Sequence, residues 1–243
     1  KRMEDVLAEA EELAAAGCKE LILIAQDVTN YGIDLYGAYK LPELLRQLCR
    51  IEGIVWIRLM YCYEDRITDE LIAVMATEPK ICHYIDIPIQ HAADTVLTAM
   101  NRRSTGASIR TTIRKLREAI PDMHIRTTLI VGFPGETEDD FEALLDFVET
   151  MRFERLGVFA YSREEGTPAG EMENQIDEAV RKRGWMRSCA ANWRSHLLSM
   201  RRRSAKPLRF WWRNAMRTAA ILAERLMMRR KSMIPYCLLR SAH

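Results

Sequence analysis

Five short runs rich in β-branched and aromatic residues recur along the chain, and a helical pattern separates each run from the next. Such alternation predicts a parallel sheet with right-handed crossovers. The predicted strands are residues 20–25, 54–61, 84–89, 125–131 and 156–161. The predicted helices are residues 4–16, 42–51, 68–76, 93–100, 107–120 and 138–150. We therefore predict the α/β class and a partial (β/α) TIM-like barrel. The chain opens on Lys1 inside a helical pattern, so we expect the first barrel unit to be missing.

Residues 125–140 form the clearest of these units. An Ile-, Val- and Thr-rich run is followed by Gly132 and Gly135, and Thr137 with Asp140 three positions later is typical of a helix start. Ligands of parallel α/β folds bind at the carboxyl ends of the strands, where glycine lets a ligand reach the backbone. By itself, this pattern fits equally well with glycines that serve only the geometry of the turn.

Polar residues or glycines follow every predicted strand. Because the ends of parallel strands lie at one edge of the sheet, we expect these residues to line a single binding site. Amide and carboxylate groups suit an ammonium group and glycine backbone suits a flat ring, so we predict a polar, nucleoside-like ligand. No G-x-G-x-x-G or Walker pattern is present, which disfavours nicotinamide cofactors and ATP. The candidate binding residues are Gln26, Asp27, Arg58, Gln90, His91, Gly132, Pro134, Gly135, Glu136, Tyr161 and Arg163.

The composition changes abruptly near residue 181. Residues 1–180 carry 19 basic and 33 acidic residues, whereas residues 181–243 carry 17 basic residues and one acid, Glu224. The second segment also holds four of the five tryptophans and contains no Asp or Val. We predict a barrel domain, residues 1–172, followed by a separate segment, residues 173–243, whose composition changes from about residue 181.

The six cysteines are scattered and show no C-x-x-C or other metal-binding spacing, so we predict no metal ligand. Dispersed thiols are typical of a reducing cytoplasm, which is the location we predict. No apolar run approaches the roughly 20 residues that a membrane span needs.

Four stretches resemble one enzyme family closely. They are LILIAQDVTNYGIDLYG (21–37), YIDIPIQHAADTVLTAMNRRST (84–105), TLIVGFPGETEDDFEALLDFVE (128–149) and FAYSREEGTPA (159–169). Together they resemble the methylthiotransferase branch of the radical S-adenosylmethionine enzymes. Within that branch, AQD-x-T-x-YG-x-DLYG and YSREEGTPA look like the RimO type rather than the tRNA-modifying MiaB type. The resemblance covers about residues 4–180.

The resemblance implies a transferase that adds a methylthio group to the β-carbon of an aspartate in a small-subunit ribosomal protein. It implies S-adenosylmethionine and [4Fe–4S] clusters as cofactors, and a ribosomal protein or the ribosome as partner. By motif, Gln26 and Asp27 would hold the methionine amino end, and Gln90 and His91 would face the nucleoside. Residues 132–136 would pack near the adenine, and Tyr161 and Arg163 would line the same edge.

Two departures from the family limit this expectation. The family's C-x-x-x-C-x-x-C motif, whose thiolates hold the radical cluster, is absent, so we predict that this chain alone is inactive. Residues 173–243 occupy the position of the family's TRAM domain but lack period-2 alternation and turn residues. We predict a frameshift near residue 181, with weak tertiary order beyond it and a helix around residues 215–230. The alternative is a genuine basic arm that contacts nucleic acid.

Other functions remain open at this point. The chain is consistent with a noncatalytic fragment that binds S-adenosylmethionine or docks on the ribosome, and with a MiaB-type tRNA methylthiotransferase. An aldolase-like (β/α) enzyme ranks last, because no predicted strand carries a lysine for acid–base work.

Overall fold

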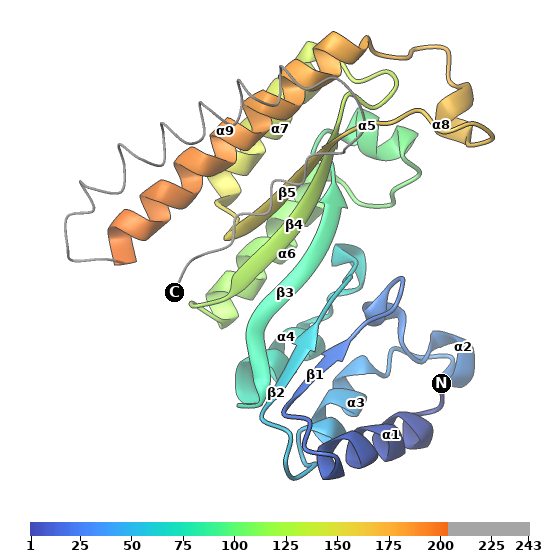
Figure 1. Ribbon diagram of the computed structural model, residues 1–243, viewed down its shortest axis with the longest axis vertical. Coiled ribbons are helices and arrows are strands. Elements are labelled where there is room, and N and C mark those ends of the chain that lie inside the picture. Colours follow the sequence, from blue (N-terminus) through green and yellow to red (C-terminus); the bar gives the residue numbers. More distant parts are fainter. Residues whose placement is uncertain (204–243) are drawn as a thin grey trace.

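The protein folds around one parallel five-stranded sheet (Figure 1). The computed structural model describes the backbone of residues 1–203 and the side chains of residues 1–190. The strands follow chain order across the sheet, and every neighbouring pair is parallel, which confirms the predicted fold class. The strands are β1 (Glu20–Leu23), β2 (Trp56–Leu59), β3 (Ile81–Gln90), β4 (His124–Val131) and β5 (Arg155–Ala160).

Helices connect successive strands and cover one face of the sheet (Figure 1). The interior of the protein lies between this face and the helices, where residues buried in strict alternation along β4, such as Ile125 and Leu129, pack in one continuous core. The larger helices are α1 (Met3–Ala15), α3 (Leu41–Leu48), α4 (Asp69–Thr77), α5 (Asp94–Ala99), α6 (Gly106–Ala119) and α7 (Glu138–Met151). Short elements follow three of the strands: η1 (Val28–Asn30) and α2 (Ile33–Tyr36) after β1, η2 (Glu64–Arg66) after β2, and α8 (Pro168–Glu171) after β5.

Threonine side chains cap four of the described helices: α4, α6, α7 and, through Thr167, α8. Thr68 accepts a hydrogen bond from the backbone of Leu71 and caps α4. Thr105 and Thr137 form capping boxes with the residues three positions later, Ser108 and Asp140. The helix start predicted from Thr137 and Asp140 is therefore confirmed, and it fixes where the loop after β4 turns into α7.

Helix α9 (Glu178–Arg203) lies beside α7 and along β5 (Figure 1). Trp185 Nε1 donates to the carbonyl of Val158 at 2.8 Å, and Arg181 Nη1 donates to the carbonyl of Tyr161 at 2.6 Å. The composition predicts weak tertiary order from residue 181 onward, but these side chains are bonded to the last strand and the residue after it. The sequence pattern does not indicate α9, because the many basic residues of this segment obscure the helical spacing of the apolar residues that pack on the sheet.

Several expectations about the C-terminal segment stay predictions. The helix around residues 215–230 lies outside the described residues, as does most of the basic segment expected to contact nucleic acid. The domain division and the frameshift are likewise untested by the fold. Among the helices of the described part, none is both long enough and apolar enough to cross a membrane.

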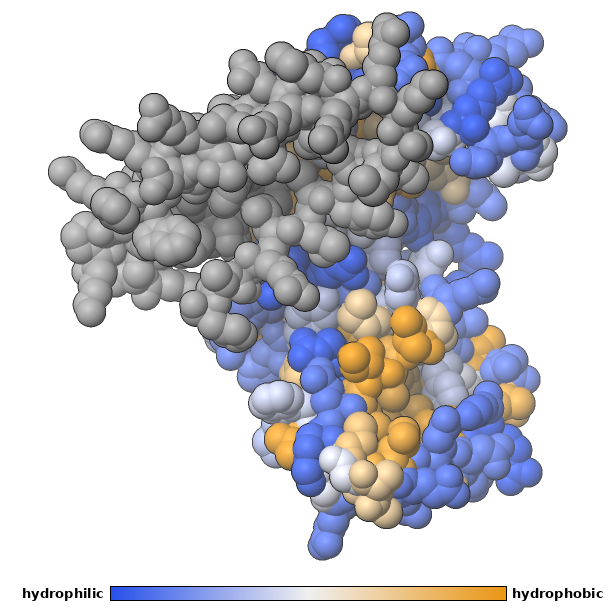
Figure 2. Space-filling view, in the orientation of Figure 1, coloured by the Kyte–Doolittle hydropathy of each residue, from blue (hydrophilic) through white to orange (hydrophobic). Residues whose placement is uncertain are grey.

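The face of the sheet opposite the helices is partly open. On β1 and the strand beside it, Ile22 and Trp56 are each 55% exposed, and Ile24 just beyond β1 is 66% exposed. Figure 2 shows an apolar area in the lower part of this view, where β1 and β2 lie. Polar residues dominate the upper right of this view, near α5 and α8, and the strands point toward the upper end of the molecule (Figures 1 and 2).

Candidate functional site

The carboxyl ends of β2 and β3 carry non-glycine residues in left-handed backbone conformations. Tyr61, after β2, has φ 56°, and Gln90, the last residue of β3, has φ 68°. Such conformations cost about 1 kcal/mol or more and cluster at ligand-binding and active sites. Two of the four such residues in the described chain therefore lie at the rim formed by the strand ends, and the other two, Asn101 and Arg152, follow α5 and α7.

Two polar side chains at this rim have buried oxygen atoms without a hydrogen-bond partner among the described residues. They are Gln90 Oε1, at the end of β3, and the hydroxyl of Tyr161, just after β5. Leaving a buried polar atom unpaired costs about 1–3 kcal/mol, so a bound polar ligand would remove this cost. The Tyr161 ring also packs edge-on against Phe133, with centroids 5.4 Å apart.

The loop after β4 is shaped by a buried carboxyl group. Gly132 and Gly135 have φ of 74° and 83°, which requires glycine. Glu136 Oε2 accepts hydrogen bonds from the backbone N–H groups of Gly132 at 2.7 Å and Phe133 at 3.2 Å. Burial raises the pKa of Glu136 to about 7. The Glu136 side chain therefore stabilises the β4 loop through hydrogen bonds to its backbone.

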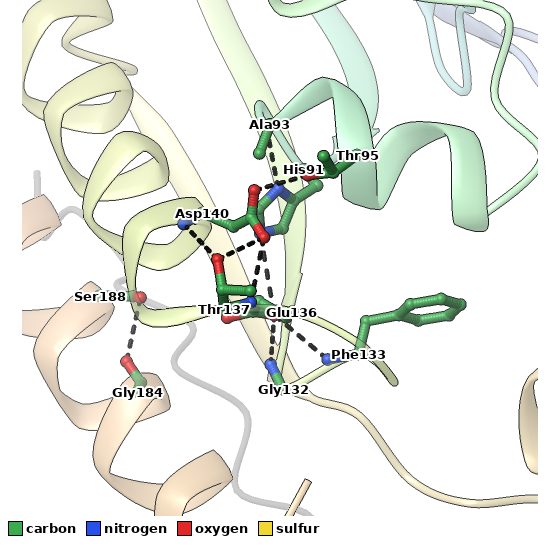
Figure 3. A network of polar contacts seen from close by, with 10 residues as sticks. All are labelled: His91, Ala93, Thr95, Gly132, Phe133, Glu136, Thr137, Asp140, Gly184 and Ser188. Atoms are coloured by element: carbon green, nitrogen blue, oxygen red, sulfur yellow. Dashed lines mark hydrogen bonds and ion pairs between the residues drawn. The ribbon is translucent and has the colours of Figure 1, made fainter. Parts of the chain in front are cut away.

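His91 is fully buried and lies beside Glu136 (Figure 3). Its Nδ1 accepts a hydrogen bond from the backbone N–H of Ala93 at 3.1 Å. A neutral imidazole that accepts at Nδ1 carries its proton on Nε2. This Nε2 is 3.8 Å from Glu136 Oε2 and has no closer partner within the described chain. Burial lowers the pKa of His91 to about 4, so the ring is neutral near pH 7.

A second contact joins the same two loops. Thr95 Oγ1, in the first turn of α5, donates to Asp140 Oδ1 at 2.5 Å. Asp140 Oδ2 accepts from the backbone N–H and the hydroxyl of Thr137, and hydrogen bonds from these threonines hold the pKa of Asp140 below its usual range despite some burial. Figure 3 shows the His91–Glu136 and Thr95–Asp140 contacts side by side. We call these four residues the loop clamp.

Three of the predicted ligand residues are used within the protein instead. Asp27 caps η1 through Thr29 and forms an ion pair with Arg66. Arg58 lies inside β2, with Nε 2.7 Å from Glu20 at the start of β1, and so points away from the rim.

Arg163 Nε donates to the Gly170 carbonyl at 2.7 Å and holds the loop that leads to α8. Gln26 is exposed on the loop after β1. A depression of about 400 Å³ is lined by Pro134 and Gly135 and by Asn174, whose carbonyl accepts a hydrogen bond from the Gly135 N–H at 2.9 Å. Of the predicted set, the structure thus brings Gln90, Tyr161 and the residues of the β4 loop together.

Arg181 of α9 is a rim residue that the sequence pattern does not indicate. A β-carbon on Gly132 would collide with its side chain, and its guanidinium stacks 6.0 Å from the centre of the Tyr161 ring. A hollow of about 270 Å³ separates the β4 loop from α9. The absent side chain at Gly132 therefore makes room for Arg181, whereas the space beside Gly135 is open.

The described part of the chain offers no site for a metal cluster. No group of three or more His, Cys, Asp or Glu side chains in residues 1–190 is placed to hold a metal ion. Cys62, nearest to the rim by sequence, is fully buried, and burial raises the pKa of its thiol. Buried neutral thiols are poor ligands.

Parallel βα units in chain order define this protein as an α/β domain of the partial TIM-barrel class. The chain matches the model of the radical SAM superfamily over residues 1–148 and belongs to that superfamily. Solved structures agree on the fold. Coproporphyrinogen III oxidase (HemN) from Escherichia coli has a TM-score of 0.58 at 17% identity, covering 79% of this chain and 46% of that one. The radical S-adenosylmethionine methyltransferase TsrM from Kitasatospora setae has a TM-score of 0.56 at 20% identity, covering 70% and 33%.

Curated relatives are much more similar in sequence. The ribosomal protein uS12 methylthiotransferase RimO of Alkaliphilus oremlandii is 58% identical over 182 residues, which are 75% of this chain and 42% of that protein. The RimO of Geobacter sulfurreducens is 58% identical over 180 residues, covering 74% and 40%. This chain therefore spans about two fifths of the length of these relatives.

Proposed function

We propose that this chain is the central part of a RimO-type methylthiotransferase acting on ribosomal protein uS12. The observation that carries the proposal is the 58% identity over 182 residues with a protein of that name. A tRNA-modifying function is less well supported, because curated relatives that are 54% to 59% identical to this chain carry the ribosomal-protein name. A ribosomal substrate would place the protein in the cytoplasm.

The rim residues fit the nucleoside cofactor of the superfamily. Gln90 Oε1 and the Tyr161 hydroxyl are buried polar atoms without a partner in the described chain, and the space beside Gly135 is open. We propose that these groups hold S-adenosylmethionine, which supplies a carbon radical when an iron–sulfur cluster is present. Asp27 and Arg58 form ion pairs within the protein, so we do not include them in this proposal.

The residues do not fit an iron–sulfur cluster. The sequence has no cysteines at cluster-binding spacing, and the described side chains offer no metal site. We therefore propose that the chain alone does not catalyse methylthio transfer. Anaerobic reconstitution with iron and sulfide should yield no stoichiometric cluster absorbance, and a clean [4Fe–4S] spectrum would contradict this part of the proposal.

Calorimetry with S-adenosylmethionine tests the binding site directly. Tyr161→Phe removes one unpaired hydroxyl, and we expect about a tenfold weaker affinity, which corresponds to one lost hydrogen bond. Tyr84→Phe is the matched control, because Tyr84 stacks under Arg58 within the sheet and lies away from the rim. Equal affinities for the wild type and Tyr161→Phe would rule out this placement of the ligand.

A noncatalytic fragment that retains nucleoside binding is the second candidate, favoured by the missing cysteine motif. The two candidates differ in one measurement. Sequencing the DNA upstream of the coding region separates them: a reading frame with a C-x-x-x-C-x-x-C motif there would favour the methylthiotransferase, and its absence would favour the noncatalytic fragment.

A further inference from the structure

The carboxyl group of Glu136 is buried and fixes the turn after β4, so its position matters for the shape of that turn. One of its oxygens accepts from two successive backbone N–H groups, those of Gly132 and Phe133. Backbone donors pointing the same way form a cradle for a negatively charged or polar acceptor. The shape of the turn therefore depends on where this carboxyl group is held, and the residues that hold it come from another loop.

His91 is the residue that faces Glu136 from that second loop (Figure 3). Its ring cannot rotate freely, because it is fully buried and Nδ1 is bonded to the Ala93 N–H. Nε2 is 3.8 Å from Glu136 Oε2, which is beyond hydrogen-bond distance, and no described group accepts a hydrogen bond from it. An unpaired buried donor is costly, so its orientation toward the carboxyl group is a built feature.

We propose that His91 is a positioning residue: its Nε2–H holds the Glu136 carboxyl group in place and so preforms the Gly132–Phe133 turn for its ligand. The parallel contact between Thr95 and Asp140 joins the same loops and keeps the His91 loop in register with α7. His91 thus acts through Glu136 and does not itself touch the ligand. The ligand's identity rests on the proposed function, but the effect of His91 on the turn does not.

The first test reads the tautomer of the wild-type chain. In a ¹⁵N-histidine-labelled sample, long-range ¹H–¹⁵N correlation separates the Nε2–H from the Nδ1–H form, and His91→Gln identifies the His91 signals. We expect a neutral Nε2–H ring at pH 7. An Nδ1–H or positively charged ring would overturn the proposal without any question of whether a variant folds.

The second test measures backbone amide exchange at Gly132 and Phe133 in the full chain without ligand. His91→Leu should speed exchange at both amides about tenfold, the effect of weakening one hydrogen-bonded turn. His91→Gln, which can place an N–H near the same point, should restore the wild-type rate to within about threefold. His83→Gln is the control, because His83 is exposed and pairs with Asp122 elsewhere.

Unchanged exchange in His91→Leu, or failure of His91→Gln to restore it, would overturn the proposal in favour of a purely space-filling histidine. Calorimetry with S-adenosylmethionine on the same variants forms a separate arm. If the wild type does not bind, the proposed function fails, while the exchange result still decides the role of His91. If it binds, His91→Leu should weaken binding and His91→Gln should recover it.

Discussion

Glu136 and His91 hold buried groups whose pKa values move in opposite directions. Burial raises the pKa of Glu136 to about 7 from 4.5 and lowers that of His91 to about 4 from 6.5. The stability associated with Glu136 is full below pH 4.5 and is lost as the pH rises to 7. The stability associated with His91 is full above pH 6.5 and is lost as the pH falls to 4. Asp140 and Glu138 are the other charged groups that act on the pair.

The pH dependence of stability from Glu136 is opposite in sign to that from His91 and covers the same pH range, so the two largely cancel in the wild type. A variant that removes one of the two groups should reveal the pH dependence that comes from the other. Each difference corresponds to about 3 kcal/mol of unfolding free energy. Relative to the wild type, His91→Gln should lose stability as the pH rises from 4.5 to 7, and Glu136→Gln should gain it. Urea unfolding followed by circular dichroism across this range measures both. Curves parallel to the wild type would show that neither group is shifted as described.

Gly132 combines a left-handed backbone with a close neighbour. We expect Gly132→Ala to cost about 1–2 kcal/mol for the backbone and about 1–3 kcal/mol more for the collision with Arg181. Gly135→Ala is the control, since Gly135 has the same handedness with open space around it. A double-mutant cycle with Arg181→Ala isolates the second part. Equal costs for the two glycines would mean that α9 does not press on the turn.

At the scale of elements, the capped helices and buried strands follow from local sequence, and α9 does not. A run rich in Ile, Val and Thr predicted β4, and Thr137 with Asp140 predicted the start of α7, because each signal depends on residues close in the chain. Helix α9 is held by Trp185 and Arg181, whose partners are carbonyls 27 and 20 residues away, in β5 and just after it. Distant pairing of this kind leaves no periodic signal.

The contact between α9 and β5 can be tested at Trp185. Trp185→Phe keeps an aromatic ring but removes the Nε1 donor to Val158, and we expect a loss of about 1 kcal/mol of stability. Trp56→Phe is the matched control, because Trp56 is 55% exposed on the open face of the sheet. We expect it to change stability by less than about 0.5 kcal/mol. If Trp185→Phe left the stability unchanged, the hydrogen bond between α9 and β5 would not form in solution.

On the scale of the whole molecule, the core runs without interruption from α1 to β5, from Met3 to Val158. A single core of this kind predicts one cooperative unfolding transition. Thiol labelling in urea, resolved by mass spectrometry, should show Cys62 at the end of β2 and Cys189 in α9 becoming reactive at the same midpoint. An earlier midpoint for Cys189 would show that α9 detaches before the sheet unfolds.

The site was less predictable from sequence than the fold. Parallel order brought Gln90, Tyr161 and the β4 loop to one edge, as the strand pattern predicted. The fates of Asp27 and Arg58 depend on Arg66 and Glu20, which are distant in sequence, so no local motif indicated that both were already paired. The loop clamp leaves no local signal for the same reason, because it joins two loops about 45 residues apart.

The two margins of the sheet differ in what they can accept. Trp185 and Arg181 already use carbonyls at the β5 margin, whereas β1 pairs only with β2 within the described chain. Within the described chain, an additional strand can therefore join at the β1 margin. A second copy that paired there would use the β1 margin of both chains, so this pairing ends at a symmetric dimer.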